Sequence, residues 1–408
     1  MKVIEKKFVI PFILVTSLFF LWGVANNMTD TLLAAFKRIM QMNDTQTSFI
    51  QLAFYGAYFC VAFPAAMFSH KYSYKSGIIL GLALYAIGAI LFFPAAKVAS
   101  YGFYLAAIYI LACGCSILET TANPYILSMG APETAIRRLN VAQAFNPLGS
   151  ISGILLSQVF ILSNISLYSI STTYMALGFV LLAIMLTIFC IKMPNKKEES
   201  NISQSDIKST IKRLILNKRY AYGIVAQFFY VGAQIGVWSF TIRIVMDELL
   251  ILEKPAATIY LISIIGFCIS RFIYTWLMKF YQPHKLLIFG ASAALLSSLL
   301  VVFSAGTGWF LVTALILISF FMSLMFPTIY GIALENVEKE ANGGKMGDAT
   351  IGASGLIMAI LGGALITPLQ GICSDRFGIY CSYLIPAFCF FVVLMYAIYI
   401  TKTSKSNI

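Results

Sequence analysis

Long apolar runs alternate with short polar segments along nearly the whole of this chain. Each run approaches the ~20 residues that a helix needs to cross the hydrocarbon core of a bilayer. The pattern therefore predicts an all-α, multi-pass membrane protein with twelve transmembrane helices. Their expected spans are residues 8–36, 46–69, 75–97, 101–130, 137–163, 170–192, 219–247, 256–281, 285–306, 308–336, 345–371 and 378–402.

The one long polar segment, residues 193–218, follows the sixth predicted helix. It divides the chain into two predicted six-helix bundles, residues 1–192 and 219–408, joined by a cytoplasmic linker. Apolar residues recur at helical spacing inside the linker, at Ile207, Ile211, Leu214 and Ile215. This spacing favours a short amphipathic helix on the membrane surface, and a plain solvated linker fits the composition equally well.

The two halves of the chain share weak internal similarity. Phe19–Gly23 in the first predicted helix is echoed by Phe228–Gly232 in the seventh. Asn123–Ile126 in the fourth is echoed by Phe326–Ile329 in the tenth. Pseudo-symmetric repeats with a substrate site near the bilayer midplane are typical of secondary transporters. The repeat therefore indicates a transporter that works by alternating access.

Composition and charge agree with a membrane protein. Of 408 residues, 60% are hydrophobic and 11% charged, and the mean hydropathy is +0.87. The net charge of +12 comes from basic residues that fall mostly in alternate loops, which is the positive-inside pattern. That placement predicts cytoplasmic termini and gives no support to nucleic-acid binding. The first apolar run has no small-residue cleavage site, so we expect a retained helix.

The sequence carries no constellation for catalysis or metal binding. Most of the eight cysteines lie inside apolar runs, and both histidines, His70 and His284, lie in predicted cytoplasmic loops. No Gly-rich phosphate-binding loop with a Lys-Ser/Thr ending is present. We therefore expect a protein that is not an enzyme and has neither a metal site nor an organic cofactor.

Two acidic residues are predicted to lie inside the membrane. Asp30 shares one face of the first helix with Gly23, Asn26 and Asn27, since their spacings are three and four. Glu119 lies in the fourth helix, one turn before Asn123 and Pro124. An ionisable side chain at such depth costs about 2.5 kcal/mol or more and marks a functional path.

A carboxyl group taken out of water is fitted to bind and release a proton, so we expect Asp30 and Glu119 to couple transport to protons. Two alternatives stay open. The polar positions could only join neighbouring helices, or the acids could be neutralised by Arg243 or Arg271 for structural reasons.

Two further polar stripes follow helical spacing. The fifth helix carries Asn140, Gln143, Asn146 and Ser150, and the seventh carries Gln227, Tyr230, Gln234 and Trp238. Amides donate to and accept from hydroxyl groups, and an aromatic ring covers the C–H face of a sugar. The set favours a neutral, polyhydroxylated solute. Each amide taken singly could also only hold helices together.

Several segments resemble the L-fucose:proton symporters of the major facilitator superfamily. The resemblance runs from about Phe8 to about Ile400. The segments that carry it are Phe19–Asp30, Leu118–Tyr125, Arg138–Asn146, Ala226–Gln234 and Trp238–Arg243.

By this resemblance, Asp30 and Glu119 match the family's two essential membrane carboxylates. Asn27, Gln143 and Asn146 match polar positions of its sugar cavity. Relatives that carry glucose or galactose commonly have Gln in place of Glu119, so the two acids favour the fucose branch.

The chain also departs from the family's pattern at two places. Thr29 stands where fucose carriers have Asn. Met325–Phe326 precedes Pro327 where they have a Gln-Tyr pair. The loss of a tyrosine hydroxyl leaves the exact sugar preference open.

We expect a secondary transporter that imports L-fucose, or a closely related neutral monosaccharide, together with protons. A proton-coupled carrier of another hexose such as glucose or galactose, and a proton-driven efflux pump, stay open as alternatives. The expected partners are the sugar, the proton and the lipid bilayer, with no nucleic acid. The expected location is the bacterial inner membrane, and the expected state is a monomer.

Overall fold

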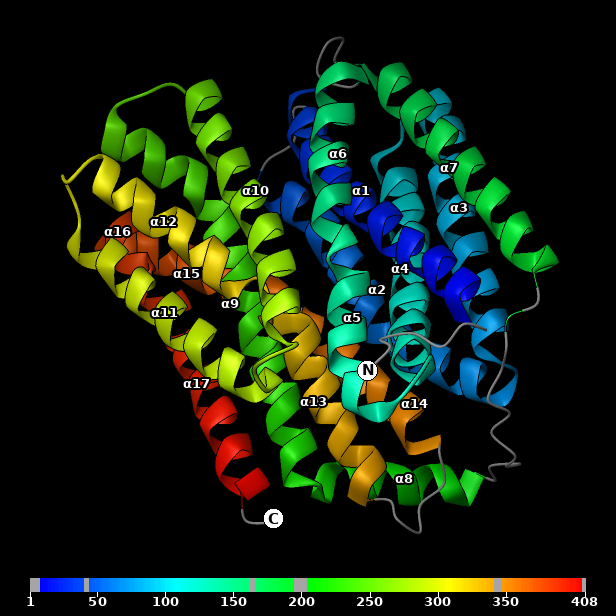
Figure 1. The fold of residues 1–408 in the computed structure, drawn as a ribbon. Helices are drawn as coiled ribbons and strands as arrows, with labels where there is room; N and C mark the ends of the chain where they lie inside the picture. The colour runs from blue at the N-terminus through cyan, green and yellow to red at the C-terminus, as the bar shows by residue number, and fades with distance from the viewer. Residues whose placement is uncertain are drawn as a thin grey trace. The chain divides into compact units, whose positions relative to one another are not determined.

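The computed structural model describes residues 8–39, 44–160, 166–191, 193, 204–340 and 347–405. Every regular element in this described part is a helix (Figure 1). The helices of the first half are α1 (Val9–Ile39), α2 (Asp44–Lys71), α3 (Tyr74–Val98), α4 (Tyr101–Ser128), η2 (Pro132–Thr134), α5 (Ala135–Gln143), α6 (Phe145–Phe160) and α7 (Leu167–Cys190). Those that follow are α8 (Gln204–Leu216), α9 (Lys218–Leu249), α10 (Glu253–Leu277), α11 (Pro283–Phe303), α12 (Trp309–Met322), α13 (Met325–Glu340), α14 (Gly347–Met358), η3 (Ala359–Leu361), α15 (Gly362–Phe377), α16 (Ile379–Ser382) and α17 (Leu384–Lys405).

Side-chain oxygens cap several helix starts. Ser73, Ser166 and Asn217 each accept a hydrogen bond from the backbone N–H three residues on. Such a cap satisfies one of the donors that the first turn of a helix leaves without a partner. These caps fix where α3, α7 and α9 begin, close to the spans expected from the apolar runs.

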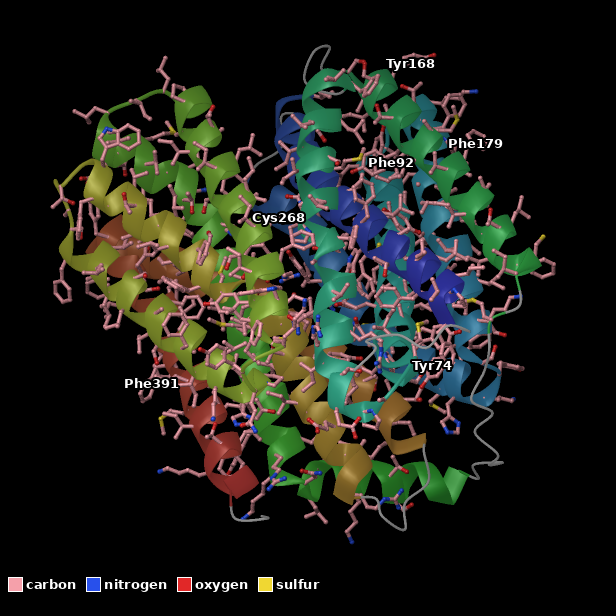
Figure 2. All side chains as sticks on the ribbon, viewed as in Figure 1. Tyr74, Phe92, Tyr168, Phe179, Cys268 and Phe391 are labelled. Carbon is pink, nitrogen blue, oxygen red and sulfur yellow. The ribbon has the colours of Figure 1, made fainter. Side chains whose placement is uncertain are left out.

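The hydrophobic spans agree with a membrane location. Ten helices of the described part are long and apolar enough to cross a membrane, and Val9–Ala25 is a shorter apolar stretch. Tyr168, Phe179 and Phe391 point outward from their helices (Figure 2) and are 69%, 58% and 46% exposed. Phe92, in contrast, is fully buried and stacks on Tyr174 at 4.1 Å between ring centroids.

The contacts divide the chain into two compact units. Unit 1 comprises Met1–Ala135, Leu148–Leu214 and Glu338–Met358. Unit 2 comprises Ile136–Pro147, Ile215–Val337 and Ala359–Ile408. Each unit therefore contains a short segment from the opposite half of the sequence. The division of the sequence at residues 193–218 into two complete six-helix bundles stays a prediction.

Helices at corresponding positions in the two halves of the chain form the same pairs in both units. In unit 1, α3 packs against α4 and α7, and α2 packs against α4. In unit 2, α11 packs against α12 and α17, and α10 packs against α12. The elements of unit 2 are the counterparts of those of unit 1 in chain order. The weak sequence repeat thus corresponds to a repeat of packing.

Four predicted helices are interrupted: the span 345–371 contains α14, η3 and α15, the span 378–402 contains α16 and α17, and the other two are described next. The helix expected at residues 137–163 consists of α5 and α6, which are separated at Ala144, three residues before Pro147. The helix expected at 308–336 consists of α12 and α13, separated at Ser323 and Leu324, before Pro327. Proline lacks the N–H that would bond to the carbonyl four residues earlier, which accounts for both breaks.

The predicted linker contains a helix. α8 covers Gln204–Leu216, with Thr210 and Leu214 buried, and Ile215 and Leu216 exposed. Residues 194–203 lie outside the described residues. The location of α8 on a membrane surface stays a prediction.

Candidate functional site

Glu119 is a buried carboxyl group in the membrane-spanning helix α4. It is 1% exposed, and Thr120, Thr121 and Asn123 beside it are fully buried. Neither carboxyl oxygen has a hydrogen-bond partner of acceptable geometry among the described residues. Asn123, one turn further on, is the side chain that approaches the carboxyl group. Because an unpaired buried carboxylate is costly, this position needs a bound proton or a hydrogen-bonding ligand.

Tyr58 of α2 links three helices around Glu119. Its hydroxyl accepts a hydrogen bond of 2.7 Å from Nε1 of Trp22 in α1, and the two rings stack at 6.4 Å. The Tyr58 hydroxyl also lies within electrostatic reach of Glu119 and Cys115 in α4. Tyr58 did not stand out in the sequence, because a single tyrosine in an apolar run is an ordinary core residue.

The polar stripe of α1 is described only in part. Asn27 is buried, and its Nδ2 donates to the carbonyl oxygen of Gly23 at 3.2 Å, one turn earlier. This bond orients the amide along its own helix. The side chains of Asn26 and Asp30 lie outside the described residues, so the role of Asp30 in proton coupling stays a prediction.

The polar stripe of α9 contains two buried groups that lack partners. Gln227 and Tyr230 are fully buried. Both amide atoms of Gln227 and the hydroxyl of Tyr230 have no hydrogen-bond partner in the described part of the chain. Buried polar groups are nearly always paired in folded proteins. Groups left unpaired without a ligand are therefore candidates for binding one.

The opposite face of α9 is used for close helix packing. Gly232 lies against Ile366, and Gly236 lies against the side-chain oxygen of Gln370, both in α15. At 100° per residue, Gly232 and Gly236 are on the side of α9 away from Gln227 and its stripe. The polar stripe is therefore separate from the α9–α15 contact.

Trp238 is fixed from two sides. Its Nε1 donates to Oγ of Ser319 in α12 at 3.3 Å, and Ser319 also accepts a bond of 2.6 Å from Ser263 in α10. The ring of Phe267 meets the indole edge-to-face at 5.1 Å. A ring held in this way is preorganised to cover an apolar ligand face. Nothing in the sequence indicated that Ser319 and Ser263 hold the indole, because each is a single serine in an apolar helix.

Gln143 and Asn146 lie on either side of the break between α5 and α6. Gln143 is buried and Asn146 is half-buried. The carbonyl oxygen of Gln143 accepts a hydrogen bond of 3.0 Å from Nη1 of Arg271. Nearby, Nδ2 of Asn140 donates to the Thr328 hydroxyl at 3.4 Å. All these residues belong to unit 2.

Among the described side chains, no acid is paired with either arginine that was considered as a structural counter-charge. Arg271 bonds to the carbonyl oxygens of Gln143 and Ser323. Arg243 is exposed and lies 5.4 Å from the centroid of the Phe240 ring. The described partners of the two arginines are thus carbonyl groups and aromatic rings.

The structure sorts the sequence-predicted residues into two groups. Asn27, Glu119 and Asn123 belong to unit 1, and the remaining described ones belong to unit 2. Gln370 of α15 was missed: it is fully buried in unit 2, and its two amide atoms lack a partner among the described residues. Its position within the predicted span 345–371 was the only available signal.

Comparisons with known proteins give a common picture. A family model described as Major Facilitator Superfamily matches residues 14–360. The chain is 43% identical to the L-fucose-proton symporter of Haemophilus influenzae over 99% of each chain. It is 35% identical to the glucose/galactose transporter of Brucella abortus, over 95% of this chain and 93% of that one.

The fold is also shared with a solved structure. The transporter FucP in the outward conformation superimposes with a TM-score of 0.87 at 36% identity, over 97% of this chain and 99% of that one. These comparisons confirm the predicted all-α fold of twelve membrane-spanning helices. The Haemophilus and Brucella relatives are named as a symporter and a transporter, which confirms a transporter rather than an enzyme.

Proposed function

The chain belongs to the L-fucose:proton symporter family of the major facilitator superfamily, and from that premise we propose that it imports L-fucose together with protons. We place it in the cytoplasmic membrane of a bacterium, because the relative that is 43% identical comes from one. Protons are the coupling ion, and no other cofactor is needed.

The burial of the Glu119 carboxyl group inside a membrane-spanning helix is the observation that carries this proposal. The carboxyl group is buried in α4, and the side chain that approaches it there is that of Asn123. A proton can neutralise such a group, and a sugar hydroxyl can donate to it, so the two ligands meet at one side chain. Asp30 is proposed as the second proton-carrying group.

The remaining polar residues are proposed to bind the sugar. Asn26, Asn27 and Asn123 contribute amides from the first half of the chain. Gln143, Asn146, Gln227 and Gln234 contribute amides in unit 2, with Tyr230 as a hydroxyl donor. Trp238 is proposed to cover the apolar face of the sugar ring, since its indole is already fixed by Ser319 and Phe267.

A proton-coupled carrier of glucose or galactose is the second candidate. The 35% identity with the Brucella abortus transporter favours it. The retained carboxyl group of Glu119 and the higher identity with the fucose carrier favour L-fucose. A proton-driven efflux pump is distinguished by its lack of preference among sugar epimers.

Uptake into proteoliposomes tests the proposal. Radiolabelled L-fucose is supplied with and without an inward proton gradient, and unlabelled D-galactose, D-glucose and L-fucose serve as competitors. Wild-type protein should accumulate L-fucose only with the gradient, and L-fucose should compete best. Glu119→Gln, which keeps the shape of the side chain but cannot exchange a proton, should lose accumulation by at least about a hundredfold.

Glu133→Gln is the matched control, because Glu133 is exposed in the short helix η2 and should leave uptake unchanged. If D-galactose or D-glucose competes better than L-fucose, that sugar is the substrate, and the proton-coupled mechanism is unchanged. Absence of any sugar flux in folded protein would overturn the proposal. Full accumulation by Glu119→Gln would exclude Glu119 from proton coupling.

A further inference from the structure

Two carbonyl groups in unit 2 lose their helical hydrogen bond to a proline. In a continuous helix, the carbonyl of Gln143 would accept from the N–H of residue 147, and the carbonyl of Ser323 from that of residue 327. Pro147 and Pro327 have no N–H. α5 accordingly ends at Gln143 and α12 ends just before Ser323.

One side chain supplies both missing donors. Nη1 of Arg271 in α10 donates to the Gln143 carbonyl at 3.0 Å, and Nε donates to the Ser323 carbonyl at 2.7 Å. Arg271 is buried, with 3% of the residue exposed. Its N–H donors are held in a rigid planar fork, so the two bonds fix the distance between the two breaks.

Arg271 also contacts the aromatic part of the candidate site. Its Cζ lies 4.7 Å from the centroid of the Phe267 ring, and Phe267 packs edge-to-face on Trp238. Tyr230 lies within electrostatic reach of the guanidinium. A single buried cation therefore joins the break that carries Gln143 and Asn146 to the support of Trp238.

We propose that Arg271 is a positioning residue that replaces the backbone donors lost at Pro147 and Pro327, and so holds Gln143, Asn146 and Trp238 in their binding arrangement. The part of this proposal that concerns sugar rests on the proposed function. The hydrogen-bond clamp itself rests on the geometry of unit 2 alone. Arg271 is not proposed to touch the sugar.

A proline reversal tests the clamp directly. Pro147→Ala and Pro327→Ala return an N–H to each break, so they should replace what Arg271 supplies. The variants are Arg271→Gln, Arg271→Lys, Pro147→Ala/Pro327→Ala, and the triple variant that combines Arg271→Gln with both alanines. Arg376→Gln, at an exposed arginine near the end of α15, is the matched control.

Uptake kinetics and thermal unfolding are measured on purified protein for each variant. Arg271→Gln should raise the KM for L-fucose by about tenfold or more, with a smaller effect on the maximal rate. Arg271→Lys should not restore the KM, because an ammonium group lacks the planar fork. The triple variant should recover most of the lost affinity, and Arg376→Gln should match wild type.

The melting temperatures, recorded without sugar, report on the clamp independently of transport. Arg271→Gln should lower the melting temperature less in the Pro147→Ala/Pro327→Ala background than in wild type. Equal decreases in the two backgrounds, or full activity of Arg271→Lys, would overturn the proposal. If the alanines themselves abolish uptake, the melting temperatures alone decide. If Arg271→Gln lowers the melting temperature less in the Pro147→Ala/Pro327→Ala background, but the wild-type protein takes up no L-fucose, the clamp is supported and the proposed substrate is refuted.

Discussion

Gly149 in α6 lies directly against the carbonyl oxygen of Phe20 in α1, so closely that a methyl group on Gly149 would overlap that oxygen. Gly362 of α15 has the same relation to the carbonyl oxygen of Phe228 in α9. Each unit thus joins two corresponding helices through a glycine–carbonyl contact, and Gly153 of α6 adds a second one in unit 1, against the carbonyl oxygen of Val24. Small residues let membrane helices approach closely, because apolar lipid provides no hydrophobic force to press them together.

Gly149→Ala should therefore destabilise unit 1. The added methyl group must displace backbone rather than a flexible side chain, which costs about 1–3 kcal/mol. Thermal unfolding of the purified protein measures this. Gly56→Ala is the control: Gly56 lies in α2 with open space around it, and alanine there should be neutral or stabilise the helix by up to about 1 kcal/mol. Equal melting temperatures for the two variants would refute the close contact.

Gln227→Met should separate stability from binding. Both amide atoms of Gln227 are buried without a partner among the described residues, so an apolar side chain of similar size removes a cost of about 1–3 kcal/mol. We expect a higher melting temperature and a KM for L-fucose at least about tenfold higher. Gln282→Met, at an exposed helix start, should change neither. A Gln227→Met variant with normal KM would remove Gln227 from the sugar site.

Ser319→Ala should weaken sugar binding through Trp238. The indole N–H then loses its acceptor, and the ring is less well fixed, so the KM should rise about 3–10-fold with little change in maximal rate. Trp238→Phe should have a larger effect, because it also removes ring area. Ser239→Ala, at the exposed neighbour of Trp238, provides the control. An unchanged KM in Ser319→Ala would show that the hydrogen bond does not matter for binding.

Glu248, near the end of α9, holds together one end of unit 2. Its carboxylate accepts hydrogen bonds from the backbone N–H groups of Gly306 and Gly308 and from the Tyr380 hydroxyl, the last at 2.9 Å. Both glycines have positive φ, 77° and 62°, so the loop between α11 and α12 is shaped around the carboxylate.

Glu248→Gln should lower stability by about 1.5–3 kcal/mol, since an amide offers one accepting oxygen in place of two. The urea or thermal midpoint of the purified protein measures this loss. Asp247→Asn, at the adjacent residue, should lower stability by less than about 0.5 kcal/mol. A similar loss in both variants would indicate a general charge effect rather than the three specific bonds.

The sequence predicts most of the fold because hydrophobic length is a strong signal in membranes. Apart from α8 in the polar linker and the short η2, the helices of the described part fall within or close to the runs predicted from apolar residues. Glu119 was found because an acid in an apolar run is conspicuous, and its burial agrees with that prediction. Ser319 was missed, because a serine among apolar residues can bond to its own helix and carries no distinct pattern.

The partners of each helix could not be read from the pattern. A proline in an apolar run does not by itself mark a break, since Pro64, Pro94 and Pro124 lie inside continuous helices. Nothing in the sequence shows that one arginine reaches the breaks before Pro147 and Pro327. The grouping of residues 136–147 with the second half of the chain was equally hidden, since periodicity reports which face of a helix is apolar and not which neighbour covers it.

This grouping has a consequence for how the polypeptide could be divided. Ile136 packs on Gly331 within unit 2, and the Thr350 hydroxyl bonds to that of Tyr74 within unit 1 at 2.9 Å. A fragment 219–408 made alone would lack part of its own core, and a fragment 1–192 would lack the segment that packs on α2 and α4. Each fragment needs the other to complete its own unit. A chain cut inside the linker should therefore fold only when both fragments are synthesised in the same cell.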